Sequence, residues 1–525
     1  MKDRKPQKKE EQASLYRQLQ EYCRSDVYPL HMPGHKRRMG DFGDPFSVDI
    51  TEVEGFDNLH QAEGLLKEAQ ENAAGLYGAE ETFFLVNGST AGVLSAIGAC
   101  AHSRSSSRIL MARNSHRSAY HALYLNRLDP VFLYPGHYRN ADRGIPEAFY
   151  EDEEGFPLLN GKIPPEQVER ALQEYPEACA VFVTSPTYDG VVSDIAEIAR
   201  IAHKASVPLI VDEAHGAHFG FHPAFPPSAL SQGADLVIQS VHKTLPSLTQ
   251  TALLHVQGTL ADRTLLRRML RIYQTSSPSY VLMASIDRCV REMAQDGQFL
   301  MQQLSDHLEQ FNARMENLKQ LQILPTDDPS RILIGTGSSG LSGKQICAML
   351  RTQYHLEPEM EAPGYVLAIM SVGDDAEGFR RLGDALLEID RTAGREIPAG
   401  SGIPRTSVKT GGEGKTAAAA DRICEMPYAS MGTAETVIPL WKAWDMPKEG
   451  TALSRCEGRI SAEVVCVYPP GIPIVVPGER IGRSACSELQ NLKNRGFSFT
   501  DCLDSSLETL QVLREDTAAG RHDFI

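Results

Sequence analysis

The sequence lacks an apolar run long enough to cross a membrane. A transmembrane helix needs about 20 consecutive, mainly apolar residues, and no stretch of the 525 residues has that character. The first residues, Met1 to Pro6, are mostly charged, and no apolar stretch follows them, so they do not have the form of a secretory signal. We therefore expect a cytoplasmic protein without a membrane segment.

Cysteines at metal-binding spacing are also missing. The ten cysteines are spread from Cys23 to Cys502, and no two of them form a Cys-x-x-Cys pair. This pattern is unlike that of a zinc ribbon or of the disulfide framework of a small secreted domain. We expect free thiols and no metal site.

Basic residues are fewer than acidic ones in this sequence. Lys and Arg number 52 against 68 Asp and Glu, which gives a formal net charge of −16. Binding to nucleic acid relies on a basic surface that neutralises phosphates, so this balance weighs against a nucleic-acid partner. The acidic excess either attracts cationic small molecules or only keeps the protein soluble, and the sequence leaves both explanations open.

What the sequence does contain is typical of a large soluble protein. Hydrophobic residues make up 42% and charged residues 23%, and the length predicts about two to four domains. Between residues 45 and 278, short apolar runs alternate with helical patterns, which indicates an α/β fold with parallel strands buried on both faces. These runs are residues 82–86, 180–183, 208–211 and 236–238.

The chain divides into five predicted segments. A long helix is expected over residues 280–320, where Met283, Ile286 and Val290 recur at helical spacing. A Gly- and Ala-rich stretch further on is typical of a linker. The predicted segments are an N-terminal arm (1–44), a large domain (45–300), a small α+β domain (301–392), the linker (393–420) and a C-terminal α+β domain (421–525).

A lysine follows directly on one of the predicted strands. Lys243 comes just after the run 235–239, with Ser240 between them. Ligands of open α/β sheets bind beyond the carboxyl ends of the strands. A lysine placed there loses water, its pKa falls, and its neutral amine can form an imine with an aldehyde. Taken alone, the pattern also fits an ordinary surface lysine.

A carboxylate ends the preceding apolar run. Asp212 follows residues 208–211 and stands about one helix and one strand before Lys243. A carboxylate at this place can keep a pyridine nitrogen protonated, which makes pyridoxal phosphate an electron sink. The alternative is a magnesium-binding Walker-B acid, but that site needs a Gly-x-x-x-x-Gly-Lys-Ser/Thr loop, which the sequence lacks.

Three further polar turns follow predicted strands. Residues 87–92 include Ser89 and Thr90 and precede a helical pattern, where backbone N–H groups and the helix dipole favour a phosphate. Ser and Thr are also ordinary helix caps. His116 either stacks on an aromatic cofactor or is a solvated loop residue, and residues 184–190 form a turn by composition.

Five strand ends thus present polar groups of the kinds that a pyridoxal-phosphate site uses. The carboxyl ends of parallel strands meet at one edge of a sheet, so these groups are expected to lie together. The combination predicts a pyridoxal-phosphate enzyme more strongly than any one of the motifs does.

These motifs resemble those of the bacterial ornithine/lysine/arginine decarboxylases. The resemblance is to the short form of that family, which lacks an N-terminal regulatory domain. It implies the aspartate-aminotransferase fold (fold type I) for the large domain. The segments that carry it are residues 31–36, 49–52, 57–60, 87–90, 114–118, 184–190, 212–215, 240–243, 468–473 and 476–479.

The resemblance also implies a role for each matching residue. Lys243 matches the Schiff-base lysine of the family, Asp212 the partner of the pyridine nitrogen, and His116 the ring-stacking histidine. His215 is expected near the substrate carboxylate or the imine. The other expected cofactor contacts are Ser89, Thr90, Ser240 and His242 at the phosphate, Ala214 at the ring face and Thr187 at the phenolic oxygen.

The implied reaction is decarboxylation of a basic amino acid in polyamine metabolism, with arginine preferred over lysine or ornithine, by a homodimer or higher homo-oligomer. The basic end of such a substrate needs a carboxylate partner, for which Asp57 and Glu435 are candidates. Asn58 stands where the family commonly has a second Asp. The alternatives are another fold type I reaction, such as transamination or aldol-type cleavage, and an inactive decarboxylase-like regulatory subunit.

Overall fold

A seven-stranded sheet organises the largest part of the structure. Its strand order is β2-β8-β7-β6-β5-β3-β4, and β8 alone among them runs antiparallel to its neighbours. The predicted α/β class with a mostly parallel sheet is confirmed. The computed structural model describes residues 15–39, 43–104, 106–136, 138, 159, 161–362, 364–393, 434–467, 471–494 and 497–514.

The strands of this sheet fall where the apolar runs of the sequence predict them. The runs 82–86, 180–183, 208–211 and 236–238 correspond to β2, β5, β6 and β7. The bounds are β2 (Glu81–Leu85), β3 (Arg108–Ala112), β4 (Asp129–Leu133), β5 (Val181–Thr184), β6 (Leu209–Asp212), β7 (Leu236–Gln239) and β8 (Ala252–Val256).

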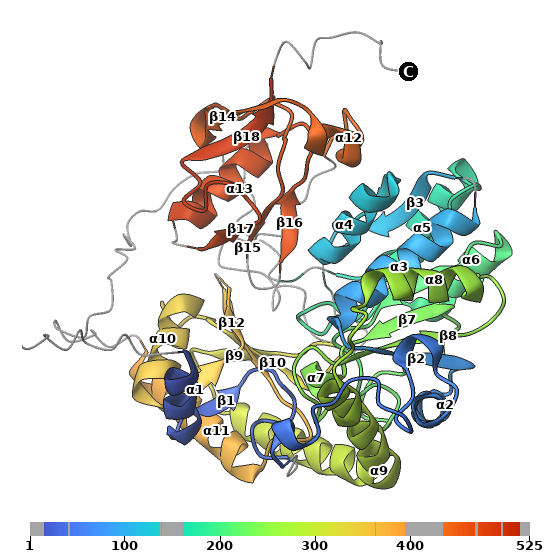
Figure 1. Cartoon of the computed structure of the whole chain (residues 1–525). Coiled ribbons are helices and arrows are strands. Elements are labelled where there is room, and N and C mark those ends of the chain that lie inside the picture. The colour runs from blue at the N-terminus through green and yellow to red at the C-terminus, as the bar shows by residue number, and fades with distance from the viewer. Residues whose placement is uncertain are drawn as a thin grey trace, which may run out of the picture.

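Helices cover both faces of this sheet (Figure 1). They are α2 (Leu65–Tyr77), α3 (Gly88–Ser103), α4 (Arg117–Asn126), α5 (Pro165–Glu174), α6 (Ile195–Lys204), α7 (Val241–Thr244) and α8 (Arg263–Tyr273). Ile109 and Met111 of β3 pack with α3, α4 and α8, while Leu110 and Ala112 pack with α5 and α6. Burial of both faces explains why the strands are apolar throughout.

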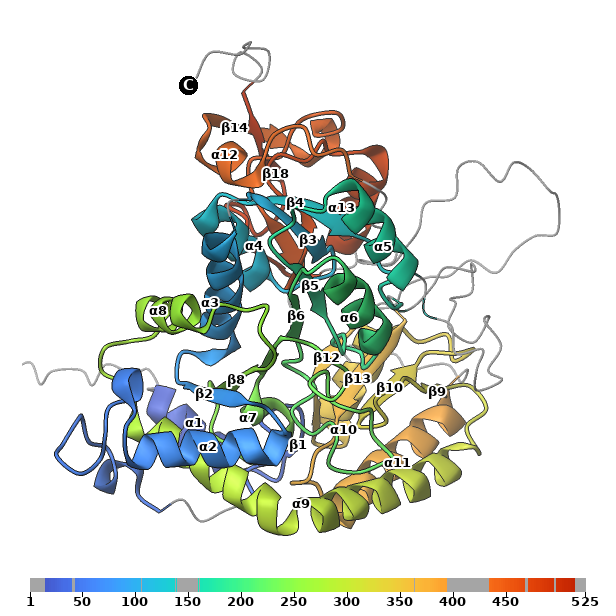
Figure 2. The same ribbon diagram turned by 90° about the vertical axis from the view of Figure 1, so that its right-hand side faces the viewer.

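A smaller unit is built on a second sheet, which is antiparallel and has the order β12-β13-β10-β9. The predicted long helix is present as α9 (Tyr280–Met315), which packs against α2 at one end and α11 at the other (Figure 2). It runs across the domain boundary predicted at residue 300. The remaining elements are β9 (Gln322–Leu324), β10 (Arg331–Gly335), α10 (Gly343–Gln353), β12 (Met360–Glu361), β13 (Tyr365–Ile369) and α11 (Ala376–Thr392).

The N-terminal segment lies on this smaller unit. After α1 (Leu15–Arg24), strand β1 (Tyr28–Leu30) pairs in parallel with β11 (Leu356–Pro358). A short 3-10 turn, η1 (Pro45–Ser47), and a second, η2 (Leu59–Gln61), then lead to α2. Although α9 is long, none of the helices in the described part of the chain has the apolar length to cross a membrane.

A third unit follows at the C-terminus, drawn in orange and red in Figure 1. It has its own apolar core, which includes Leu453, Val465 and Leu489. The predicted linker, 393–420, lies outside the described residues beyond position 393. The elements of this unit are α12 (Leu440–Asp445), β14 (Lys448–Ala452), η5 (Leu453–Arg455), β15 (Val465–Val467), β16 (Ile472–Val475), α13 (Arg483–Asn494), β17 (Phe499–Thr500) and β18 (Thr509–Leu513).

One buried arginine fastens the C-terminal unit to the large sheet. Arg113 follows β3, and its guanidinium donates to both carboxylate oxygens of Glu479, over 3.2 and 3.1 Å. Its other bonds go to the carbonyls of Pro473 (2.7 Å) and Ile474 (3.1 Å). A bond of 2.8 Å to the Tyr120 hydroxyl uses the last N–H group. An arginine has five N–H donors, so this one is fully satisfied.

We expect Glu479→Gln to destabilise the protein strongly. The substitution leaves the Arg113 guanidinium buried without its counter-charge, which costs about 3 kcal/mol of unfolding free energy. Urea unfolding at pH 7 measures the loss. Glu435→Gln is the matched control, because Glu435 pairs with Arg480 at the surface and such pairs contribute about 1 kcal/mol or less. Equal, small losses in both variants would contradict the fastening role.

Candidate active site

A cavity of about 450 Å³ lies at the carboxyl ends of the central strands. The loops after β2, β3, β5, β6 and β7 all line it, as the strand-end argument predicts. Met32 and Pro33 from the N-terminal segment and Ile472 of β16 complete the wall. Each residue predicted to act in catalysis or to bind the cofactor lines this cavity, namely Ser89, Thr90, His116, Thr187, Asp212, Ala214, His215, Ser240, His242 and Lys243.

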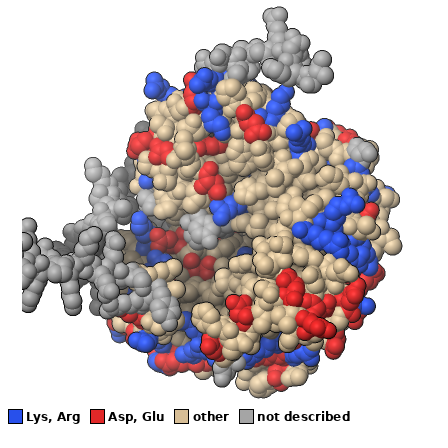
Figure 3. All heavy atoms as spheres, in the orientation of Figure 1, with Lys and Arg blue, Asp and Glu red and all other residues tan. Residues whose placement is uncertain are grey.

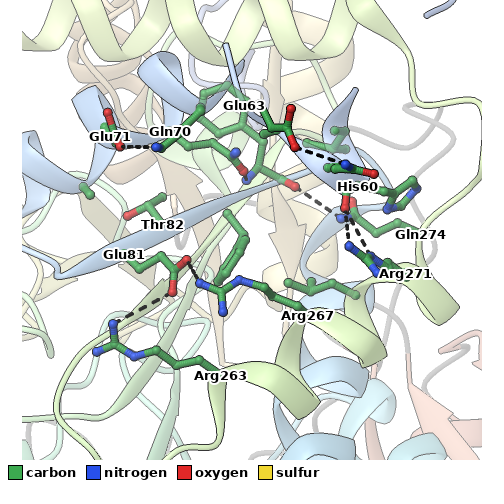
Figure 4. A pocket seen from close by; sticks show the side chains of 18 of the residues that line it. His60, Glu63, Gln70, Glu71, Glu81, Thr82, Arg263, Arg267, Arg271 and Gln274 are labelled. Atoms are coloured by element: carbon green, nitrogen blue, oxygen red, sulfur yellow. Dashed lines mark hydrogen bonds and ion pairs between the residues drawn. The ribbon is translucent and has the colours of Figure 1, made fainter. Parts of the chain in front are cut away.

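A second cavity, of about 510 Å³, lies between α8 and the segment from η2 to β2. Figure 3 shows basic side chains gathered over α8 with acidic ones beside them. Figure 4 shows how these charges meet: Arg263 and Arg267 point to Glu81. Arg271 donates to the carbonyl of His60. The residues that the sequence predicts for catalysis and cofactor binding all line the first cavity, and none of them lines this second one.

Lys243 sits on the short helix α7, directly after β7, and its amine meets the ring of His215. The distance from Nζ to Nε2 of His215 is 2.9 Å. Burial lowers the pKa of Lys243 to about 8, while the negative charges of Asp212 and Glu359 work in the opposite direction. With a pKa of about 8, about a tenth of the lysine amines are neutral and nucleophilic at pH 7, far more than for an ordinary lysine.

Asp212 is the last residue of β6 and is buried. The N–H of Ala214 donates to its Oδ1 over 3.1 Å. Burial raises the pKa of Asp212, and the positive charge of Lys243 opposes that rise. The carboxylate therefore gains most from a positively charged partner inside the cavity.

The histidines of the cavity are held neutral. Burial lowers the pKa of His116 to about 3 and that of His242 to about 4, and it lowers that of His215 well below its usual range. The His116 ring is oriented by Ser118, whose N–H donates to Nδ1 over 3.3 Å. His242 Nδ1 lies 2.8 Å from the carbonyl of Thr251 and so carries the proton.

The end of the cavity at α3 suits an anion. The helix begins at Gly88, which has a φ of 73°, a conformation that favours glycine. The hydroxyls of Ser89 and Ser240 lie 2.6 Å apart beside it. Two buried oxygens on the cavity wall, Oδ1 of Asn114 and Oγ1 of Thr184, have no hydrogen-bond partner among the residues that the structure describes. Such orphaned polar atoms indicate a polar ligand.

Segment 31–36 packs directly behind the turn that carries Lys243. The N–H of Gly34 donates to the carbonyl of His242 over 2.8 Å. A Cβ atom at Gly34 would lie 2.6 Å from the backbone carbon of Thr244, so only glycine fits there. Segment 31–36 is one of the motifs that carry the family resemblance, but the sequence alone gives it no role. In the structure it packs against the backbone of α7.

Lys36, in the same segment, is a buried anchor rather than a reactive lysine. Its ammonium donates to the carbonyl of Ile369 over 2.6 Å and lies 3.5 Å from the Asp374 carboxylate. These bonds tie the N-terminal segment to the smaller unit, which holds Met32 and Pro33 in the cavity wall.

Two residues of the smaller unit approach the cavity without any signal in the sequence. Glu359 accepts hydrogen bonds from the Tyr188 hydroxyl and from the N–H of Met32, at 3.0 Å for the latter. Both partners line the cavity. Arg331 of β10 donates to the carbonyl of His215 over 2.9 Å. Neither residue follows a strand of the large sheet, so the strand-end argument could not find them.

The two carboxylates proposed for the substrate lie elsewhere in this chain. Asp57 has a positive φ of 68°, and its carboxylate accepts the N–H groups of Asn58, Glu63, Gly64 and Leu66 in its own loop. Glu435 is exposed and paired with Arg480. Neither lines the cavity. Among the described residues, no three His, Cys, Asp or Glu side chains gather as metal ligands would.

Two family models match the chain. Residues 13–333 match "Orn/Lys/Arg decarboxylase, major domain", and residues 440–496 match the C-terminal domain of the same family. An arginine decarboxylase of Bacillus subtilis is 30% identical, over 96% of this chain and 98% of its own length. The lysine decarboxylase LdcA of Pseudomonas aeruginosa is 25% identical, over 97% of this chain and 79% of its own length.

Solved structures share the fold. The lysine decarboxylase LdcF of Francisella novicida superposes with a TM-score of 0.71 at 18% identity, covering 96% of this chain and 81% of that one. An alanine–glyoxylate aminotransferase of Nostoc superposes with a TM-score of 0.52 at 14% identity, covering 70% of this chain and 96% of that one. The predicted aminotransferase-like fold is confirmed.

The buried histidines predict a loss of stability in acid. His255 lies in the sheet between Thr82 and Gln239, and burial lowers its pKa to about 3, as for His116. In the unfolded chain these rings titrate near their ordinary 6.5, so the unfolded state binds more protons below that pH. Stability is therefore full above pH 6.5 and falls as the pH drops toward the folded values, by about 2 kcal/mol per histidine at pH 5.

Urea unfolding at pH 7 and pH 5 tests this expectation. His255→Gln removes one of these titrations without touching the cavity, so it should lose about 2 kcal/mol less than the wild type on acidification. An identical pH dependence in the two proteins would show that the buried rings are not its source.

Proposed function

The chain belongs to the Orn/Lys/Arg decarboxylase family and acts on a basic amino acid; we propose that arginine is its substrate and that Lys243 binds pyridoxal phosphate. The observation that carries the cofactor assignment is the buried Lys243 amine, whose pKa is lowered to about 8, beside a buried carboxylate and a neutral histidine. Curated relatives at about 30% identity are named arginine decarboxylases, which supports the choice of arginine.

The polar groups of the cavity fit pyridoxal phosphate. The N-terminus of α3 with Ser89 and Ser240 suits the phosphate. The orphaned oxygens of Asn114 and Thr184 are available to the polar substituents of a ligand. When bound, this cofactor supplies a conjugated ring that accepts the electron pair released as CO₂ leaves.

Each reactive side chain then has a defined task. The buried Asp212 carboxylate would hold the ring nitrogen of the cofactor in its protonated form, because a positive partner favours the charged carboxylate. The neutral His116 ring, held by Ser118, offers a flat face for stacking. The protonated Lys243 side chain would return a proton to the reacting carbon after CO₂ has left, and His215 lies 2.9 Å from that nitrogen to exchange it.

Glu359 is the carboxylate that we assign to the basic end of the substrate. It bonds to Tyr188 and Met32 of the cavity wall, and its negative charge acts on Lys243, which places it within electrostatic reach of the reacting amine. A guanidinium is best held by a carboxylate. Asp57 and Glu435 remain candidates only through a partner subunit.

We further propose a cytoplasmic homodimer that serves polyamine synthesis. Large apolar side chains are exposed in the segment before α2, including Phe46 (86% exposed), Val53 and Phe56. Exposed apolar groups that cluster in one segment are typical of an interface, which supports a second copy of the chain at this place.

A competition assay tests the proposed function. Cofactor-loaded protein is incubated with equal arginine, lysine and ornithine, and the amines formed are identified by mass spectrometry. We expect agmatine to dominate and Lys243→Ala to form none. Cadaverine or putrescine as the main product would transfer the assignment to lysine or ornithine. No amine from any of the three would contradict decarboxylation of a basic amino acid.

Glu359→Gln is expected to weaken the use of arginine. Glutamine keeps the bonds to Tyr188 and Met32 but loses the charge, which predicts a fall in kcat/KM of about 10- to 100-fold, mainly through KM. Glu357→Gln is the matched control, because Glu357 pairs with Arg351 at the surface. If both variants keep wild-type kinetics, another residue holds the substrate's basic end.

A further inference from the structure

The contact between Lys243 and His215 depends on which ring nitrogen of His215 carries the proton. Nε2 lies 2.9 Å from Nζ of Lys243. If Nε2 is the acceptor, the lysine must donate and can be charged. If Nε2 carries the proton, it donates to Lys243, and an amine accepts a hydrogen bond only when it is neutral.

The other ring nitrogen faces a group that can only donate. Nδ1 of His215 lies 3.4 Å from a terminal guanidinium nitrogen of Arg331, and the same nitrogen donates to the His215 carbonyl over 2.9 Å. A guanidinium has five N–H groups and no acceptor. A proton on Nδ1 would point at these N–H groups, so the arginine disfavours that tautomer.

We propose that Arg331 is a positioning residue that favours the Nε2–H form of His215 and thereby shifts Lys243 from its ammonium form toward the neutral amine. This inference rests on the proposed function, which makes Lys243 the reacting lysine. It explains why a fully buried arginine stands at the start of β10, where it crosses from the smaller unit to the floor of the cavity.

Arg331 is rigidly held for such a task. Its side chain is completely buried, and the nearest carboxylate, Asp328, lies 3.8 Å away. It donates to the Ser330 hydroxyl over 3.1 Å. A Cβ at Gly190 would come within 2.8 Å of its stem, so the loop after β5 closes over it. These contacts leave the guanidinium little freedom to turn away from His215.

The charges around Lys243 agree with this arrangement. Asp212 from β6 and Glu359, which lies between β11 and β12, favour the charged lysine, whereas Arg331 opposes it. His116 on the α4 side is held neutral by burial and by the charge of Lys243 itself. Removing the arginine therefore acts in one direction, toward protonated Lys243.

Competitive labelling of the cofactor-free protein tests the proposal without any turnover. A trace amine-acylating reagent is applied between pH 6.5 and 10, and the Lys243 peptide is quantified against that of the exposed Lys67. We expect a midpoint near the wild-type pKa of about 8. In Arg331→Met the midpoint should rise by about one unit, which slows labelling at pH 7 about tenfold. Arg331→Lys, also a donor without an acceptor, should restore it.

The relay through His215 is tested by repeating Arg331→Met in a His215→Asn background. Loss of the shift there supports the proposal, whereas an equal shift with and without His215 overturns it, because the arginine would then act as a charge alone. If Arg331→Met does not fold, ¹⁵N-histidine spectra of the wild type decide, since a proton on Nδ1 of His215 contradicts the proposal. Labelling requires no substrate, so these outcomes are independent of whether the chain decarboxylates arginine.

Discussion

Two basic side chains in contact cannot both be charged, and the active site is arranged around that constraint. Lys243 and His215 meet at 2.9 Å, and burial lowers the pKa of each of them. The pairing holds only while water is kept from the floor of the cavity. The sheet brings the two side chains together, because β6 and β7 are neighbouring parallel strands and the loops that follow them, with His215 and Lys243, lie at the same edge.

The remaining units of the chain close that site from three sides. The N-terminal segment packs Gly34 against the backbone behind α7. From the smaller unit, Arg331 donates to the carbonyl of His215, and Glu359 accepts from the N–H of Met32. The C-terminal unit contributes Ile472 of β16, and Arg113 bonds to the carbonyls of Pro473 and Ile474 in the same strand. A large sheet alone would present the same reactive groups to open water, where the lysine would stay protonated.

The central sheet and the polar loops that line the cavity could be predicted from the sequence, because both depend on local pattern. Buried parallel strands are short apolar runs, and each run ended in a polar turn, so Asp212 and Lys243 could be placed together without knowing the sheet order. Arg331 and Glu359 could not, because Arg331 comes from a strand of another sheet and Glu359 from the connection between β11 and β12, and each is a single charged residue in otherwise ordinary surroundings. Asp57 has a suitable carboxylate, but its four backbone bonds show that the loop itself uses the charge.

The bonds of the Arg113 guanidinium also affect how the C-terminal unit stays attached to the rest of the protein. Four of its five bonds connect parts of the protein that stand more than 350 positions apart in the sequence, without any covalent link between them. A backbone cut between the smaller and the C-terminal unit would therefore leave two pieces that migrate together under native conditions and separate only in denaturant. In that sense the C-terminal unit behaves like a permanently bound subunit that happens to be encoded in the same chain.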